Sequence, residues 1–305
     1  MRLVFFGSSN FSIPILEALV QSHEVLAVIT QPDRPKGRGL KVQPTPVKEW
    51  AMKRGLKVFD PEKLDVEFAE VLSALMPEAI VVASYGKIVP KTILEVPPFG
   101  CLNVHPSLLP KLRGAAPIQW AILKGKRETG VTVFLMDEGL DSGPILLQRK
   151  TAIGDEETAQ ELERRLSGMG ASLTIEALEL IQRGEIKPVP QRDEEACYAP
   201  KLSREVGLID WSSPSKKLKD MVRGLEPWPC AYTFYRGKTL KIWKATCKEG
   251  KGSPGEVISL KEGIEVACGE GSLLIKELQL EGKRRMKAEE FLRGYKLSIG
   301  EKLGR

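Results

Sequence analysis

Residues 3–30 read LVFFGSSNFSIPILEALVQSHEVLAVIT, and this order of apolar blocks predicts how the N-terminal part of the chain folds. The runs at 3–6 and 25–30 are short and rich in Val, Leu, Ile and Phe, which is typical of buried strands. Between them, residues 13–20 place apolar side chains three and four positions apart, as on one face of a helix. A strand, a helix and a second strand in this order predict two parallel strands joined by a crossover helix.

The same alternation continues over about the first 185 residues. Further strands are predicted at 57–59, 79–84, 101–104 and 131–136, and further helices at 47–54, 67–75, 117–123 and 158–183. We therefore predict an α/β fold with a Rossmann-like, mostly parallel sheet covered by helices on both faces. In such sheets ligands bind beyond the carboxyl ends of the strands.

The C-terminal part has a different pattern. Residues 187–204 are rich in Pro, Gln and charge, which predicts a linker. Beyond it, short strand-like runs separated by glycines occur at 232–234, 239–244, 255–259, 263–267 and 273–276. Strands with this spacing predict a small, OB-like β-barrel. We thus expect a catalytic domain at 1–186, a linker at 187–204 and a barrel domain at 205–305.

The composition bounds the class of protein. Hydrophobic residues make up 42% of the chain and charged residues 28%, as in soluble globular proteins. No apolar run approaches the roughly 18 residues of a membrane span, so we expect no membrane segment. The five cysteines are scattered, odd in number and without a CxxC spacing. This pattern disfavours a metal site and a disulfide framework, and it favours a reducing, cytoplasmic location.

Basic residues gather in the C-terminal third. Residues 201–305 hold 22 Lys or Arg against 14 Asp or Glu, whereas the rest of the chain holds 24 against 26. This asymmetry indicates a polyanionic partner, most simply a nucleic acid, although a lysine-rich solvated surface would give the same count. Trp211, Trp228 and Trp243 could stack on bases, but we assign all three to the barrel core, where tryptophan is more common.

Two candidate catalytic side chains lie at the end of a predicted strand. Asn103 and His105 are two positions apart, so their side chains point to the same face of the sheet. An amide donor and an imidazole on one side of a small group could stabilise an oxyanion and handle a proton. A strand end with a turn-forming Asn and a solvated His would give the same spacing. Likewise, GLDSG at 139–143 reads as a turn in which Asp141 caps its own backbone.

Several motifs together resemble the methionyl-tRNA formyltransferases, a branch of the folate-dependent formyltransferases, over nearly the whole chain. NVHPSLLP at 103–110 is similar to all folate-dependent formyltransferases, whereas RGAAPIQ at 113–119 and QPDRPKGRG at 31–39 resemble the tRNA enzymes more narrowly. The remaining similar motifs are DEGLDSG at 137–143, YAPKL at 198–202, IDW at 209–211 and PWP at 227–229.

The resemblance implies the reaction and its catalytic residues. A formyl group would pass from 10-formyltetrahydrofolate to the α-amino group of methionine on the initiator methionyl-tRNA. Asn103 would donate to the tetrahedral oxyanion, His105 would face it and relay a proton, and Asp141 would orient His105. Neither a metal nor a covalent intermediate is needed.

The resemblance also implies two binding regions. The folate co-substrate is expected at Tyr85, Gly86, Ile88, Val89, Ser107, Leu108, Leu109 and Pro110. The tRNA is expected at a flexible basic loop over 31–40 and at the basic barrel. The loop contacts would be Arg34, Lys36, Arg38 and the neighbouring Lys41, with Arg38 the important one. We expect the protein to be a monomer.

Two other functions are weighed against this one. A folate-dependent formyltransferase for a phosphoribosyl amine or an amino sugar would keep Asn103, His105 and Asp141, but it would not need the basic barrel. A catalytically inactive RNA-binding relative would have no reason to keep all three residues.

Overall fold

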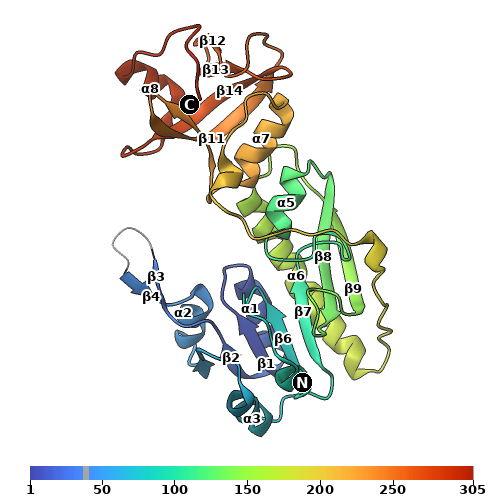
Figure 1. Ribbon diagram of the computed structural model, residues 1–305. Helices are drawn as coiled ribbons and strands as arrows, with labels where there is room; N and C mark the ends of the chain where they lie inside the picture. The colour runs from blue at the N-terminus through green and yellow to red at the C-terminus, as the bar shows by residue number, and fades with distance from the viewer. Residues whose placement is uncertain (37–40, 305) are drawn as a thin grey trace. The chain divides into compact units, whose positions relative to one another are not determined.

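The computed structural model describes residues 1–36 and 41–304 (Figure 1). They group into two compact units. The first unit comprises Met1–Pro117, Glu128–Ala152 and Glu163–Pro200. The second comprises Ile118–Arg127, Ile153–Leu162 and Lys201–Arg305, so two short segments of the N-terminal part group with the C-terminal part.

A seven-stranded sheet forms the centre of the first unit, in the order β5-β2-β1-β6-β7-β8-β9. The four pairs from β5 to β7 are parallel, and the two pairs that involve β8 are antiparallel. The prediction of a mostly parallel α/β sheet is therefore confirmed. The strands are β1 (Arg2–Gly7), β2 (Glu24–Ile29), β5 (Val58–Phe59), β6 (Ala79–Ala83), β7 (Cys101–His105), β8 (Glu128–Leu135) and β9 (Ile145–Ala152).

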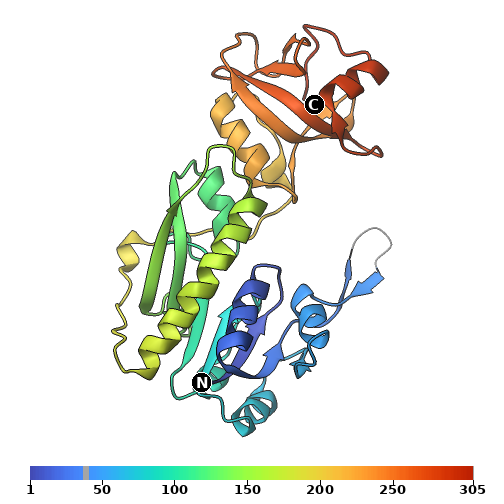
Figure 2. The same ribbon diagram turned by 180° about the vertical axis from the view of Figure 1, so that it is seen from behind.

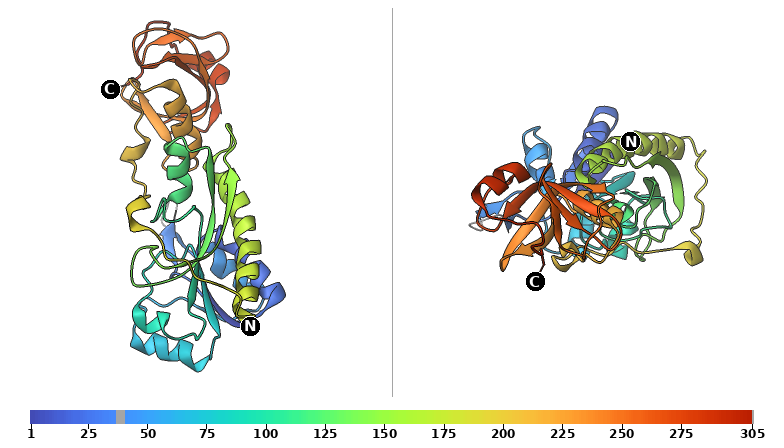
Figure 3. Two further views of the ribbon diagram at one scale, coloured as in Figure 1. Left: turned by 90° about the vertical axis from the view of Figure 1, so that its right-hand side faces the viewer. Right: turned by 90° about the horizontal axis from the view of Figure 1, so that it is seen from above.

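Helices cover both faces of this sheet (Figures 2 and 3). On one face lie α1 (Ser12–Ser22) and α6 (Ala159–Gln182), whose Gly170 approaches side chains of β7, β8 and α1. On the other face, α3 (Val66–Ala74) and α4 (Lys91–Leu94) pack on a buried cluster of alternate β1 and β6 residues. Because both faces are covered, β6 and residues 3–6 of β1 are apolar and buried.

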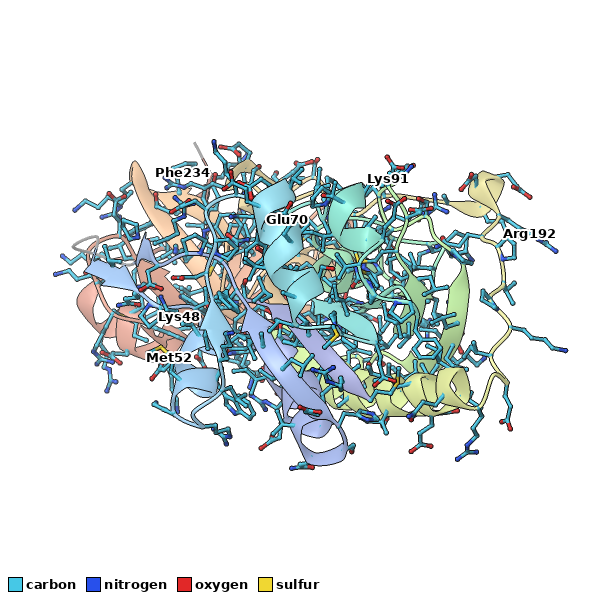
Figure 4. The ribbon with its side chains drawn as sticks, turned by 90° about the horizontal axis from the view of Figure 1, so that it is seen from below. Lys48, Met52, Glu70, Lys91, Arg192 and Phe234 are labelled. Atoms are coloured by element: carbon cyan, nitrogen blue, oxygen red, sulfur yellow. The ribbon has the colours of Figure 1, made fainter. Side chains whose placement is uncertain are left out.

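A hairpin lies where the sequence predicts a flexible loop. Strand β3 (Arg34–Lys36) pairs with β4 (Lys41–Gln43), so the prediction of a loop over all of 31–40 is wrong at 34–36. Helix α2 (Pro46–Met52) follows, capped by the Thr45 hydroxyl. Its Lys48 binds Asp33 at 2.8 Å and Asp60 at 2.6 Å, which anchors the hairpin base (Figure 4).

The second unit is built on a curled antiparallel sheet, in the order β10-β11-β14-β13-β12 with β15 beside β14. Its C-terminal tail bridges the two ends, since Val257 donates to Glu301 O while Gly304 donates to Phe234 O. The predicted barrel is confirmed as this half-barrel. The strands are β10 (Ala231–Tyr235), β11 (Lys238–Lys248), β12 (Val257–Ser259), β13 (Ile264–Ala267), β14 (Ser272–Leu280) and β15 (Met286–Lys287).

Three helices belong to this unit, α5 (Pro117–Leu123), α7 (Ser215–Gly224) and α8 (Ala288–Gly294). On α7, Arg223 donates to the carbonyls of Gly154 and Glu157, and Gly224 leaves room for Ile122 of α5. These contacts explain why 118–127 and 153–162 group with the C-terminal part. No helix within the described ranges is both long and apolar enough to cross a membrane.

The three tryptophans of this unit differ in environment. Trp211 is buried in the core and donates to the Thr233 hydroxyl at 3.1 Å, as predicted. Trp243 is half-buried, with the Arg285 guanidinium 4.7 Å from its ring centroid. Trp228 is 56% exposed, so its assignment to the core is wrong. It lies between Pro227 and Pro229 in a loop, outside the strands whose alternation buries side chains.

Candidate active site

Strand β7 presents Asn103 and His105 near its carboxyl end. Asn103 pairs in register with Val82 of β6 and Phe134 of β8, and His105 pairs with Thr132. The two side chains share one face, as their spacing predicts. Asn103 is partly exposed, and its amide has no hydrogen-bond partner within 1–36 and 41–304. That amide is therefore available to an external acceptor.

His105 is only 5% exposed, and each ring nitrogen has a defined neighbour. Nε2 lies 2.9 Å from the carbonyl oxygen of Leu112, which can only accept a hydrogen bond. Nε2 therefore carries a proton in either charge state of the ring. Nδ1 lies 3.6 Å from Oδ2 of Asp141, so Nδ1 is the nitrogen at which a proton can be gained or lost.

Asp141 lies in the loop between β8 and β9, with its side chain 12% exposed. Its Oδ2 accepts a 2.7 Å hydrogen bond from the backbone N–H of Gly114. The residue has φ +51°, a conformation that Asp and Asn adopt more readily than other non-glycine residues. The prediction that Asp141 caps its own backbone is wrong, since the carboxylate that caps this turn is that of Asp137, which accepts from the Gly139 N–H at 3.0 Å. The carboxylate of Asp141 instead lies beside Gly114 and His105.

The loop after β7 contains the four residues of the SLLP motif, and the side chains of Thr132 and Gln148 hold its backbone in place. Thr132 donates to the Ser107 carbonyl at 2.7 Å and accepts from the Leu109 N–H at 3.2 Å. Gln148 donates to both Thr132 and the Leu109 carbonyl. Ser107 and Leu109 are buried, whereas Leu108 and Pro110 are partly exposed. Only the latter pair and backbone groups of this loop can face a ligand.

The loop after β6 contains the other residues expected to contact folate. Ile88 is 87% exposed, whereas Val89 is buried. The Tyr85 ring is also buried, against Phe6, and burial raises the pKa of its phenol to about 12. Tyr85 therefore offers a ligand only its backbone, and its carbonyl already accepts from Gln31 at 2.7 Å.

A pocket of about 400 Å³ lies at the carboxyl ends of β1, β2 and β6. It includes Tyr85 and Gly86, but neither the SLLP loop nor the Asn103–His105 pair borders it. The structure thus places the residues expected at the folate in two groups, on the loops after β6 and β7. The pocket is lined by Ser8, Ser9, Asn10, Gln31, Pro32, Arg34, Gln43, Thr45, Pro46, Ser84, Tyr85, Gly86 and Glu163.

Three of the four basic residues expected at the tRNA lie on the strands β3 and β4, namely Arg34, Lys36 and Lys41. Arg34 is exposed and lies 3.2 Å from Glu62, in an ion pair that solvent weakens. Lys36 and Lys41 pair with each other through the backbone of the hairpin. Arg38 lies outside the described residues.

Two models of known protein families match this chain. The model of the formyl transferase family matches residues 1–178, and that of the formyl transferase C-terminal domain matches residues 201–296. The chain belongs to the formyl transferase family. The first match covers the strand that carries Asn103 and His105 and the loop that carries Asp141, and the second covers most of the half-barrel.

Relatives of this formyl transferase align over almost their whole length. The methionyl-tRNA formyltransferase of Caldanaerobacter subterraneus subsp. tengcongensis is 50% identical, and the alignment covers 98% of this chain and 99% of the relative. The methionyl-tRNA formyltransferase of Citrifermentans bemidjiense is also 50% identical, over 100% of this chain and 97% of the relative.

Solved structures share the fold of this formyl transferase at lower identity. HypX from Aquifex aeolicus in complex with tetrahydrofolic acid has a TM-score of 0.67 and 24% identity, covering 96% of this chain and 47% of HypX. The sugar 3N-formyl transferase WlaRD, solved with dTDP and 5-N-formyl-THF, has a TM-score of 0.69 and 17% identity, covering 93% and 99%. At this identity the likeness concerns the fold alone.

The cysteines of this formyl transferase should differ in reactivity. Burial raises the pKa of both Cys101 and Cys268 to about 12, so at pH 8 only about one thiol in 10⁴ is the reactive thiolate. Cys247 is exposed. We expect iodoacetamide to label Cys247 in the native protein, to spare Cys101 and Cys268, and to leave formyl transfer unchanged when the Cys247 adduct alone is present. Peptide mass mapping and an activity assay check this, and inactivation by labelling at Cys247 would contradict it.

Proposed function

We propose that this formyl transferase moves the formyl group of 10-formyltetrahydrofolate to the α-amino group of methionine on the initiator tRNA. The observation that carries the proposal is the cluster of Asn103, His105 and Asp141 in a chain 50% identical, over 98% of its length, to a methionyl-tRNA formyltransferase. The tetrahydrofolic acid bound to a structural neighbour supports a folate as the formyl donor.

Asn103 would stabilise the charge that develops on the formyl oxygen. When the neutral amine attacks the formyl carbon, that oxygen becomes an oxyanion before the bond from carbon to N10 of the folate breaks. An amide that has no partner among the described residues can donate to it without first losing another hydrogen bond. One such donor is worth roughly 3 kcal/mol of barrier.

His105 and Asp141 would manage the proton. The reaction moves one proton from the attacking amine to N10, and Nδ1 and Asp141 together can hold it in transit. Nε2 is engaged by Leu112 O, which fixes the ring plane and leaves Nδ1 facing Asp141. Oδ2 of Asp141 is already held by Gly114, so Oδ1 is the oxygen left to accept from the amine or a water.

The folate would lie between the loops after β6 and β7. The exposed Ile88 and the partly exposed Leu108 are the apolar side chains on these loops that can pack on a flat pterin. The backbone of Tyr85, Gly86, Ser107, Leu109 and Pro110 would read its edge, with Val89 supporting the loop from the core.

The RNA contacts would divide between a hairpin and the C-terminal domain. We propose residues 1–186 for catalysis, 187–204 as a linker and 205–305 for tRNA binding, with Arg34, Lys36, Arg38 and Lys41 at the acceptor end. The basic residues of the second unit differ in ion pairing. Arg223, Arg285 and Lys219 are engaged in ion pairs with Asp or Glu, whereas Lys241 and Lys244 have no ion-pair partner among the described residues.

A salt titration tests this division. Lys241 and Lys244 both point away from the half-barrel core, because the register of β11 shifts between them. We expect the double variant Lys241→Ala, Lys244→Ala to lower the slope of log K against log salt by up to about 2 and to weaken tRNA binding. Arg284→Ala is the control, because Arg284 already pairs with Glu290 at 2.5 Å. Equal effects of both variants would contradict the selection of Lys241 and Lys244.

The proposed function itself is tested by offering three acceptors with 10-formyltetrahydrofolate. We expect transfer to methionine-charged initiator tRNA, and none to free methionine or to a phosphoribosyl amine. Turnover with a small amine instead would keep the chemistry of the site but replace the substrate. Binding of charged tRNA without any transfer would indicate an inactive RNA-binding relative.

A further inference from the structure

Gln191 lies in the predicted linker and connects two loops. One loop contains Asp141, and the other contains Arg113 and Gly114. Its side-chain Nε2 donates to the backbone carbonyls of Asp141 at 2.9 Å and Gly143 at 2.7 Å. Its Oε1 accepts from the guanidinium of Arg113, from Nε at 3.1 Å and from Nη2 at 2.8 Å. One amide has two donors and two acceptor positions, so all four are used.

This network also fixes the orientation of the amide. A flipped amide would set its oxygen against two carbonyl oxygens and its NH₂ against a guanidinium, so only the orientation described can form the four bonds. Arg113 is 4% exposed, and its other contact is to Asp193, whose side chain is 82% exposed. Gln191 is thus the less exposed partner of a buried cation.

Both the backbone and the side chain of Asp141 are held by hydrogen bonds in this arrangement. Gln191 holds its backbone carbonyl, and the Gly114 N–H holds its carboxylate. The segment that contains Gly114 is itself bonded to the linker through backbone groups. The Arg113 N–H donates to the Cys197 carbonyl at 2.9 Å, and the Arg113 carbonyl accepts from the Ala199 N–H at 2.8 Å. In Figure 1 the chain after α6 runs beside β9 and then crosses the sheet toward these loops.

We propose that Gln191 is a positioning residue for the formyl transfer, acting through Asp141. The left-handed conformation of Asp141 costs of order 1 kcal/mol or more, so the loop needs contacts to keep it. The two hydrogen bonds from Gln191 supply such contacts, one at the carbonyl of Asp141 and one at the carbonyl of Gly143. They direct the carboxylate to within 3.6 Å of His105 Nδ1. Two residues outside β7 thereby matter to the chemistry on that strand: Gln191 of the linker donates to the Asp141 loop, and Arg113 orients the Gln191 amide.

Two variants distinguish the donor role of the Gln191 amide from its acceptor role. Gln191→Glu keeps an acceptor for Arg113 but removes both donors to the Asp141 loop, and Gln191→Met removes all four bonds at similar length. We expect both to lower kcat by about 10- to 100-fold with KM for folate and tRNA within about twofold, as displacement of a catalytic group by about 1 Å does. A wild-type kcat in Gln191→Glu, with a loss only in Gln191→Met, would overturn the proposal in favour of the Arg113 contact.

Two neighbours serve as controls. Arg192 projects outward from the same segment (Figure 4) and pairs with the nearby Glu195, and Asp193 is the exposed partner of Arg113. Arg192→Ala and Asp193→Asn should keep the wild-type kcat. A loss in these variants equal to that in Gln191→Glu would assign the effect to the linker as a whole and overturn a specific role for Gln191.

A double variant tests whether Gln191 acts through Asp141. In an Asp141→Asn background, Gln191→Glu should lower kcat by less than about twofold further, because the carboxylate it positions is absent. The proposal would be overturned if Gln191→Glu lowered kcat in the Asp141→Asn background by the same factor as in the wild type. It would also be overturned if Gln191→Glu raised KM and left kcat unchanged. The inference rests on the proposed function, and the wild-type assay with three acceptors tests that function separately.

Discussion

Replacing Asn103 with alanine should lower kcat for formyl transfer by about 10²- to 10³-fold, the cost of losing one preorganised donor to an oxyanion. Asn103 has no hydrogen-bond partner among the described residues, so its removal leaves no protein group unsatisfied. The midpoint of thermal unfolding and the affinity for charged tRNA should therefore change little. Single-turnover kinetics with charged tRNA measure the chemical step directly.

Asn103→Asp is the matched variant, since it keeps the size and shape of the side chain. It replaces the donor NH₂ with an acceptor that repels an oxyanion, so its kcat should be no higher than that of Asn103→Ala. Near wild-type turnover by either variant would remove Asn103 from the mechanism. A parallel loss of tRNA affinity would show that the amide binds substrate instead of stabilising the transition state.

The spacing of Asn103 and His105 predicted their shared face because that relation is local. Side chains alternate along any strand, so two residues two positions apart need no further information. The parallel sheet was predictable for a similar reason, since strands buried on both faces are apolar throughout. Edge strand β9 is half exposed and carries Gln148, Arg149 and Lys150 in a row, so its sequence lacks that signal.

The contacts that complete the site are non-local, and the sequence gives no direct signal for them. The partner of His105 Nε2 is the carbonyl of Leu112, and the partner of Asp141 Oδ2 is the N–H of Gly114. Both are backbone groups, whose use does not depend on a particular side chain. Gln191 is separated from Arg113 by 78 positions, and a glutamine in a polar linker is not distinctive. The exposure of Trp228 depends in the same way on a loop conformation outside the strands.

Replacing Asp141 should separate proton transfer from loop conformation. Asparagine adopts the left-handed backbone as readily as aspartate and keeps an oxygen for the Gly114 N–H, but it cannot take up a proton. We expect Asp141→Asn to lower kcat by about 10²- to 10⁴-fold, the usual contribution of a general acid–base group, with little change in the thermal midpoint. Rates of single turnover and thermal unfolding give the two readouts.

Alanine at the same position removes the proton acceptor and also disfavours the backbone conformation. Asp141→Ala should therefore show a similar loss of kcat, together with roughly 1–3 kcal/mol of lost stability from the strained φ and the unpaired Gly114 N–H. If Asp141→Asn turned over at the wild-type rate while Asp141→Ala did not, the carboxylate would serve only to shape the turn. Nδ1 of His105 would then have to exchange its proton directly with water or substrate, since its other nitrogen is held by Leu112.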